Sequence, residues 1–191
     1  NYLPFDIKQH GGSIRLGRRF KWPDYFFRGS WMFKLSNNKY IADDIADFSL
    51  GFNLDDLEIK SEQGSYSFSS SGISFTQIIT RDSRNHPEFP TTGSRSIWTS
   101  ILSGSFLGGD QDYHKHKFDF NWFTPINKKI TISQTFKMGI LEKIIQNTDE
   151  RSVIPPSTRF LMGGTGIPYG EMLRGYTENR VGPFSSIRGG N

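Results

Sequence analysis

Apolar and polar residues alternate along much of the chain, as they do in β-strands whose two faces meet different surroundings. Residues 25–35 show it most clearly. Phe27, Trp31, Phe33 and Leu35 fall on one face there, and Arg28, Ser30 and Lys34 on the other. Similar stretches predict further strands over residues 12–22, 65–80 and 94–107, around 114–122 and around 130–138. In the third stretch the apolar positions change phase at Gly72, which predicts a glycine-associated bulge.

Short turns and long polar stretches separate these strands in alternation. Pro23-Asp24, the segment from Arg81 to Gly93 and the residues after Pro125 read as turns, because proline and aspartate favour chain reversal. Residues 36–63, 108–112 and 141–191 read as long loops. The alternation predicts that all turns lie at one end of a sheet and all loops at the other.

The predicted strands are longer than the five or six residues common in soluble proteins. They match the roughly 9–11 tilted residues that cross a bilayer. Aromatic residues at the strand ends fit the interfacial girdles of such barrels: Trp22, Tyr25, Phe26, Trp122 and Phe123. Six strands cannot close a barrel, and open edges are not tolerated in lipid, so we expect a piece of a larger barrel. A soluble β-sandwich also alternates and stays an alternative.

Composition agrees with a surface that is apolar on one side only. The 191 residues include 17 Phe, 7 Tyr, 4 Trp and 20 Gly, yet the mean hydropathy is −0.52. No stretch approaches the roughly 18 apolar residues of a membrane-spanning helix. The chain has no cysteine, which excludes disulfides and thiolate chemistry. The net charge of +4 is scattered, which argues against nucleic acid as a partner.

Sharper chemical readings find little support in the sequence. The glycines from Gly163 to Gly166 lack the Lys-Ser/Thr of a phosphate-binding loop. His114 and His116 share a strand face, but no carboxylates converge on them in sequence. The acidic residues between 43 and 58 lack calcium-loop spacing and read as a solvated or lipopolysaccharide-facing loop. No nucleophile elbow is present. We therefore expect no enzyme, no catalytic or metal site and no cofactor.

Three segments, in this order, resemble the barrel of the BamA family of outer-membrane protein assembly factors. The first is the strand-turn-strand from Leu16 to Phe26. The second is the turn that contains Arg81, Asp82, Pro90 and Gly93. The third and most specific joins the segment from Pro156 to Gly164 with Leu173-Arg174-Gly175-Tyr176.

The resemblance implies where these residues act. It makes the whole chain part of one outer-membrane barrel domain with a probable 16 strands, of which these are similar to strands six to eleven. The upstream periplasmic repeats and the remaining strands are then expected outside this chain. The family's long loop, here residues 141–191, folds into the lumen. Arg174 would bind acidic residues of the inner wall beyond Asn191, since a guanidinium can take a carboxylate bidentately. Leu173, Gly175 and Tyr176 complete this anchor motif. Four residues would support the loop: Arg159, Phe160, Gly163 and Gly164.

The resemblance also implies a function. Family members fold and insert β-barrel clients into the bacterial outer membrane without an external energy source, by pairing incoming strands at a weak seam. The implied partners are unfolded barrel clients, accessory lipoproteins, lipid and lipopolysaccharide. A two-partner secretion pore and a TamA-like factor share the arginine loop and stay open as alternatives. A diffusion porin would instead need an open lumen and no Arg174.

Overall fold

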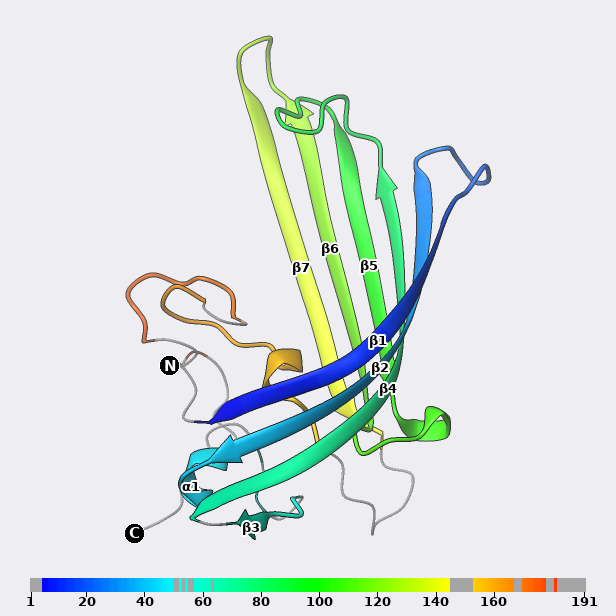
Figure 1. Ribbon diagram of the computed structural model, residues 1–191. Coiled ribbons are helices and arrows are strands. Elements are labelled where there is room, and N and C mark those ends of the chain that lie inside the picture. Colours follow the sequence, from blue (N-terminus) through cyan, green and yellow to red (C-terminus); the bar gives the residue numbers. More distant parts are fainter. Residues whose placement is uncertain are drawn as a thin grey trace.

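The computed structural model describes residues 5–49, 52, 54, 57–62, 64–144, 153–166, 170–177 and 181. Its main feature is one antiparallel sheet with the strand order β1-β2-β4-β5-β6-β7 (Figure 1). The long strands are β1 (Asp6–Arg19), β2 (Phe27–Ala42), β4 (Ser65–Asp82), β5 (Gly93–Ser103), β6 (Tyr113–Pro125) and β7 (Thr131–Lys143). The short elements are α1 (Ile45–Phe48), β3 (Lys60–Glu62), η2 (Ser105–Leu107) and η3 (Pro156–Thr158). Within the described residues, no helix is long and apolar enough to span a membrane.

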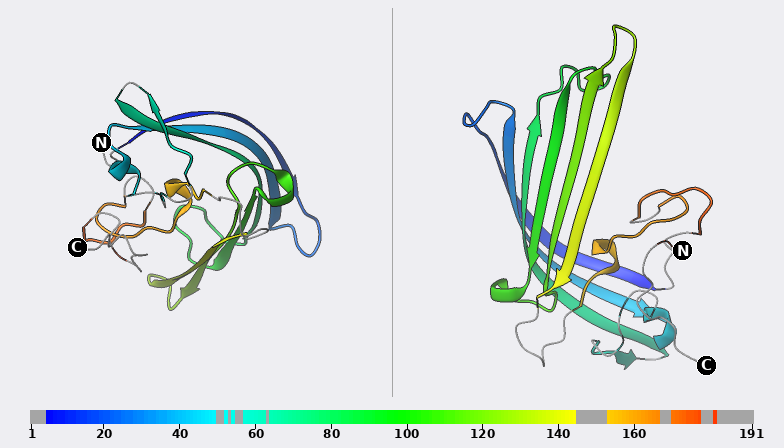
Figure 2. Two further views of the ribbon diagram at one scale, coloured as in Figure 1. Left: turned by 90° about the horizontal axis from the view of Figure 1, so that it is seen from below. Right: turned by 180° about the vertical axis from the view of Figure 1, so that it is seen from behind.

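The predicted all-β antiparallel fold and its six long strands are confirmed. Each strand pairs with its neighbour along the chain, except that β2 pairs with β4 and the three-residue β3 adds to the end of β4. The sheet curves strongly and stays open between β1 and β7 (Figure 2). The short turns lie at one end and α1, β3 and η2 at the other, as the alternation predicts (Figure 1).

The register divides the sheet into an outer, convex face and an inner, concave face. Paired residues share a face, so Ile14 lies beside Phe33, and Phe120 beside Phe136, on the outer face. Large apolar residues stay exposed there, including Ile14, Leu16, Phe33, Leu35, Trp98, Trp122, Phe136 and Met138. An exposed apolar patch of this extent marks a surface that meets lipid or protein.

Several predicted boundaries are wrong. The second strand runs on to Ala42, so the first part of the expected loop 36–63 is strand, paired with residues up to Gly72 of β4. Polar residues in a strand resemble a loop because they lack apolar alternation. The first strand begins at Asp6, and the fourth ends at Ser103 before η2. The strand β7 continues to Lys143, past the expected start of the long loop.

The predicted bulge at Gly72 is also wrong. The pairing of β2 with β4 continues without interruption from Leu35–Ile73 through Ser36–Gly72 to Tyr40–Phe68. The side chains keep their alternation, and the apolar positions change from the outer face to the inner one. The reason is a change of surroundings, because the inner face of this strand end is covered by a small core.

This core lies at the loop end of the sheet. It consists of Phe5, Tyr40, Ala42, Phe48, Phe52, Leu57, Phe68 and Val153. Phe48 of α1 is 0% exposed and meets Phe68 edge-on with ring centroids 5.0 Å apart. The carboxylate of Asp44 accepts from Ala46 N–H at 3.0 Å and caps the helix that places Phe48 there. Val153 ties the start of the long loop to the same core.

Candidate functional site

The described part of the long loop lies on the concave side of the sheet (Figure 2). Val153 N–H donates to Asp110 O at 2.9 Å, which fixes its base beside the loop before β6. The short helix η3 then reaches two separate parts of the wall. Pro156 and Ser157 line a small pocket with β1 and β2 residues, namely Ile7, Gln9, Asn38 and Tyr40. On its other side, the carbonyl of Thr158 accepts a hydrogen bond from Lys115 Nζ of β6.

Phe160 packs tightly between the loop and the wall. Its ring lies against Gly139 of β7, where an added Cβ would meet ring atoms at 2.3, 2.6 and 3.0 Å. Lys115 Nζ lies 4.3 Å from the ring centroid, which is cation–π geometry. Lys115 therefore holds the loop twice, through the ring and through the Thr158 carbonyl. We call Lys115, Gly139, Thr158 and Phe160 the loop seat.

The two parts of the predicted loop motif pair with each other. Leu173 N–H donates to Gly164 O at 3.1 Å, and Gly163 N–H donates to Glu171 O at 3.1 Å. Glu171 N–H in turn donates to Leu161 O at 2.8 Å. The backbone of residues 161–164 is thus joined to the segment that carries the arginine motif. The side chain of Glu171 also meets Lys137 of β7 at 3.1 Å, with both groups about half exposed (51% and 54%).

Arg174, Gly175 and Tyr176 form the exposed tip of this paired segment. Gly175 has φ +86°, in the left-handed region that glycine adopts without strain, so the chain can turn sharply at this position. The expected carboxylate partners of Arg174 were placed beyond Asn191, so this contact stays a prediction. Residues 145–152, 167–169, 178–180 and 182–191 of the predicted loop lie outside the described residues.

Arg159 is the half-buried cation of the loop. Its backbone N–H donates to Pro156 O at 3.2 Å and closes η3. Burial lowers the pKa of its guanidinium, because the charged form loses hydration there. A guanidinium still keeps its proton at any ordinary pH, so Arg159 places a fixed positive charge next to Phe160.

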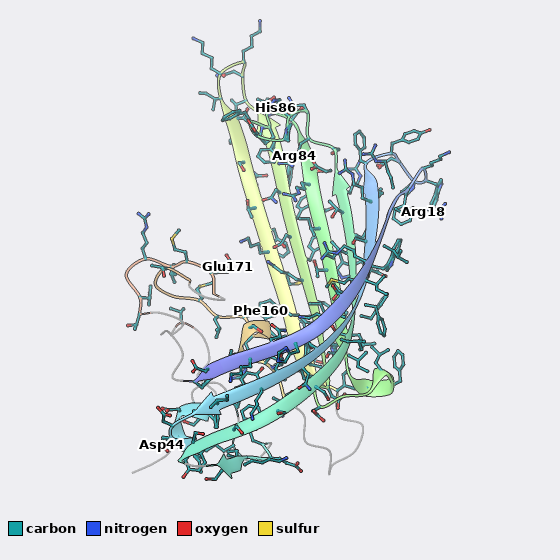
Figure 3. The ribbon with its side chains drawn as sticks, viewed as in Figure 1. Arg18, Asp44, Arg84, His86, Phe160 and Glu171 are labelled. Carbon is teal, nitrogen blue, oxygen red and sulfur yellow. The ribbon has the colours of Figure 1, made fainter. Side chains whose placement is uncertain are left out.

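The predicted turn from Arg81 to Gly93 lies at the opposite end of the sheet, with Arg84 and His86 (Figure 3). Arg84 donates two hydrogen bonds to the Asp82 carboxylate, from Nε and Nη2, each at 2.8 Å. Its Nη1 donates to Pro87 O at 3.1 Å. The hydrogen-bonded Asp82 raises the pKa of Arg84. Arg81 Nε reaches Asp24 at 2.9 Å and so links this turn to the one between β1 and β2.

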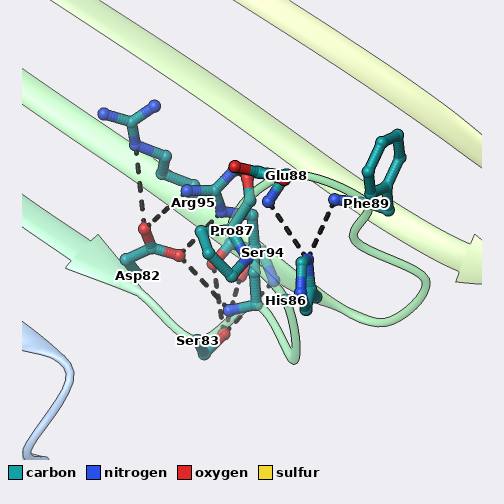
Figure 4. A network of polar contacts seen from close by, with 9 residues as sticks. Asp82, Ser83, His86, Pro87, Glu88, Phe89, Ser94 and Arg95 are labelled. Carbon is teal, nitrogen blue, oxygen red and sulfur yellow. Dashed lines mark hydrogen bonds and ion pairs between the residues drawn. The ribbon is translucent and has the colours of Figure 1, made fainter.

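Further side-chain bonds close the same turn (Figure 4). His86 Nδ1 accepts from the backbone N–H groups of Glu88 and Phe89 at 3.3 and 3.1 Å. Gly93 has φ +95°, and an added Cβ would lie 2.3 Å from Ser83 O, so only glycine fits there. Pro90 is half-buried in the turn. These contacts hold the turn together at the end of the sheet opposite the loop seat.

Comparison with known protein families decides between the fold-level readings. The sequence matches the Omp85 superfamily domain over residues 1–191. The chain belongs to the Omp85 superfamily. This superfamily of bacterial outer-membrane β-barrels includes BamA, TamA and two-partner secretion transporters. No curated protein matches the chain.

Titratable side chains of this Omp85 chain lie both on the outer face and around the loop. No three His, Cys, Asp or Glu side chains gather as metal ligands in the part of the chain that is described. His114 and His116 lie 5.4 Å apart between ring centroids on the outer face, and His114 Nε2 is 3.6 Å from Glu142. The polar groups of the inner face instead hold the loop.

Sequence reasoning found Phe160 but missed the wall side of its seat. Lys115 lies on the polar face of its predicted strand, among other polar residues that nothing in the sequence distinguishes. Gly139 follows an alternating stretch, and a glycine inside a strand signals the close approach of another group. That signal was present, but the sequence does not say which aromatic ring approaches.

Proposed function

We propose that this chain is part of a BamA-type insertase, which folds β-barrel proteins and inserts them into the bacterial outer membrane. The observation that supports the proposal is the loop with the arginine motif, which lies on the inner face of β6 and β7 in an Omp85 chain. A two-partner secretion pore and a TamA-like factor share this loop, so the experiments below are chosen to separate them from an insertase. The proposed activity involves no enzymatic reaction and needs no cofactor. Its partners are unfolded barrel clients, accessory lipoproteins and the surrounding lipid.

In this proposal the described strands provide the wall and the loop provides an internal brace. The outer face meets lipid with its exposed apolar residues, while the polar inner face holds the loop through Lys115 and Lys137. Arg174 is then the loop's second attachment, to carboxylates on another part of the inner wall. A barrel that opens a seam for incoming strands needs such a brace, because each broken strand pair removes hydrogen bonds that lipid cannot replace.

The proposal is tested with Arg174→Ala in the full-length protein. We expect normal expression, a barrel that unfolds at lower temperature, and a lower yield of folded client barrels in reconstituted membranes. The matched control is Arg18→Ala, which removes an exposed arginine near the opposite end of the sheet (Figure 3). Arg174→Lys is expected to recover only part of the activity, because an ammonium cannot take a carboxylate bidentately. Unchanged client folding by Arg174→Ala would contradict the proposal.

Depletion of the protein in cells and conductance measurements separate an insertase from its main alternatives. A two-partner secretion pore is favoured if depletion of the protein abolishes export of one secreted partner and leaves resident barrels at normal levels. A TamA-like factor is favoured if only a subset of barrels depends on it. A diffusion porin predicts steady ion conductance in planar bilayers, whereas the loop across the concave side favours a low or fluctuating conductance.

A further inference from the structure

A cationic group lies on the outer face of the sheet, at the end opposite the short turns. Lys8 of β1 and Lys39 of β2 are direct cross-strand partners, and both are exposed. His10 pairs with Asn37, the next position of the same face toward the apolar zone. Lys60 of β3 pairs with Ser67 of β4, whose other partner is Ile41, so it lies on this face too. We call Lys8, His10, Lys39 and Lys60 the cationic patch.

Neither Lys8 nor Lys39 forms an ion pair with a carboxylate of the described residues. Asp6 shares their face, one position farther from the apolar zone. Like charges directly opposite each other destabilise a strand pair. An anion bound between the two ammonium groups would remove this repulsion.

The position of the patch along the strands indicates the kind of anion. On the outer face of β2 the run of apolar residues ends at Leu35, beside Gly12 of β1, and Asn37 and Lys39 follow before the half-buried Ile41. Lys39 lies four residues beyond Leu35, which is about 13 Å along a strand and about 9 Å along the membrane normal at a tilt of about 45°. The headgroup layer outside the hydrocarbon core is about 5–8 Å thick. Because lysine stems can bend back along apolar surface, these amines can reach headgroup phosphates.

We propose that the cationic patch binds the phosphate groups of the phosphorylated lipid in the outer leaflet of the membrane. The apolar outer face continues directly into the patch, so a lipid whose acyl chains pack on Leu35 and Phe33 places its headgroup beside Lys39. The inference rests on the membrane orientation of the proposed function, in which the long loops face outward. It does not depend on insertase activity.

The test uses the full-length protein in detergent and native mass spectrometry to count bound lipid. The probes are lipid A with both phosphates, lipid A without phosphates, and phosphatidylglycerol. The variant is Lys8→Gln with Lys39→Gln. Its matched control, Lys128→Gln with Lys129→Gln, makes the same charge change in the exposed turn between β6 and β7, at the other end of the sheet.

We expect the wild type and the control to bind phosphorylated lipid A about tenfold more tightly than the double patch variant, at about one-tenth-molar salt. The wild type should also prefer phosphorylated to dephosphorylated lipid A by a similar factor, a comparison that needs no variant to fold. Equal binding by the variant, equal loss in the control, or no preference for phosphate would overturn the proposal. Phosphatidylglycerol bound as tightly as phosphorylated lipid A would also overturn it. The same holds if the mass spectra show an acidic protein as the only bound partner.

A parallel client-folding assay keeps the two proposals apart. The patch variant is expected to fold clients as the wild type does, since the patch lies on the outer face and the loop seat on the inner one. Loss of lipid binding with intact client folding supports the patch alone. Intact lipid binding together with failure of the Arg174→Ala test would contradict the insertase proposal and leave the patch standing.

Discussion

Gly139→Ala should release the long loop from the wall without unfolding the sheet. The added methyl group would lie 2.3 Å from the Phe160 ring, far inside contact distance, and the surrounding β7 backbone is held by its pairing with β6. The ring is the part that can move. Its displacement separates it from Gly139 and from Lys115, 4.3 Å from the ring centroid.

The free energy that the seated loop loses follows from the contacts of Phe160. The residue is 47% exposed, so about half of a phenylalanine burial, about 1 kcal/mol, is at stake. A partly exposed cation–π contact adds about 0.5–1 kcal/mol. The seated state should therefore lose about 1–2 kcal/mol relative to the released loop, which corresponds to a roughly fivefold to thirtyfold larger released population.

Trypsin measures that population in the reconstituted full-length protein, because the loop contains Arg159 and the exposed Arg174. Cleavage rates follow the released fraction when release and return are fast. Gly12→Ala is the matched control, since nothing lies within 4 Å of a Cβ at that strand position. We expect faster loop cleavage and a lower melting temperature of the barrel in Gly139→Ala, because the loop braces the barrel, and wild-type values of both in Gly12→Ala.

A double-mutant cycle with Phe160→Ala decides whether the proposed contact is the cause. On that background the ring is gone, so Gly139→Ala should add almost nothing to the cleavage rate. The reasoning is refuted if Gly139→Ala cleaves at the wild-type rate, or if its effect is the same with and without Phe160.

Three further expectations concern other parts of the chain. Phe48→Ala should cost about 3 kcal/mol locally and raise hydrogen exchange in α1 and the adjoining strand ends, while central strands keep their protection; uniform protection would contradict the small core. Asp82→Asn should lose about 1–2 kcal/mol of stability against urea, because its ionic hydrogen bonds to the partly shielded Arg84 weaken; an unchanged midpoint would contradict a structural role for the turn. Lys137→Gln should change trypsin cleavage of the loop less than about twofold, since its pair with Glu171 is half exposed; a larger change would make this pair a main anchor.

The sequence by itself determined the number, order and approximate places of the long strands. Alternation shows them directly, because each outer-face position must be apolar where it meets lipid and its neighbours face a polar interior. The turn residues were also readable, since Gly93 and the flanking prolines have few conformations to choose from. The expectation that the loop with Arg174 folds into the lumen came from the family resemblance, and the anchoring role of Arg174 stays a prediction.

Only the tertiary structure showed where the apolar positions move from the outer face of a strand to its inner face. Tyr40 and Phe68 look out of phase in sequence, yet they keep their register and turn an apolar inner face toward a local core. Likewise, Gly139 and Lys115 are part of the loop seat only because Phe160, which follows both strands in the chain, folds back on them. Periodicity reports the environment of each face of a strand, but a contact between distant segments depends on how the chain returns, and no local pattern encodes that return.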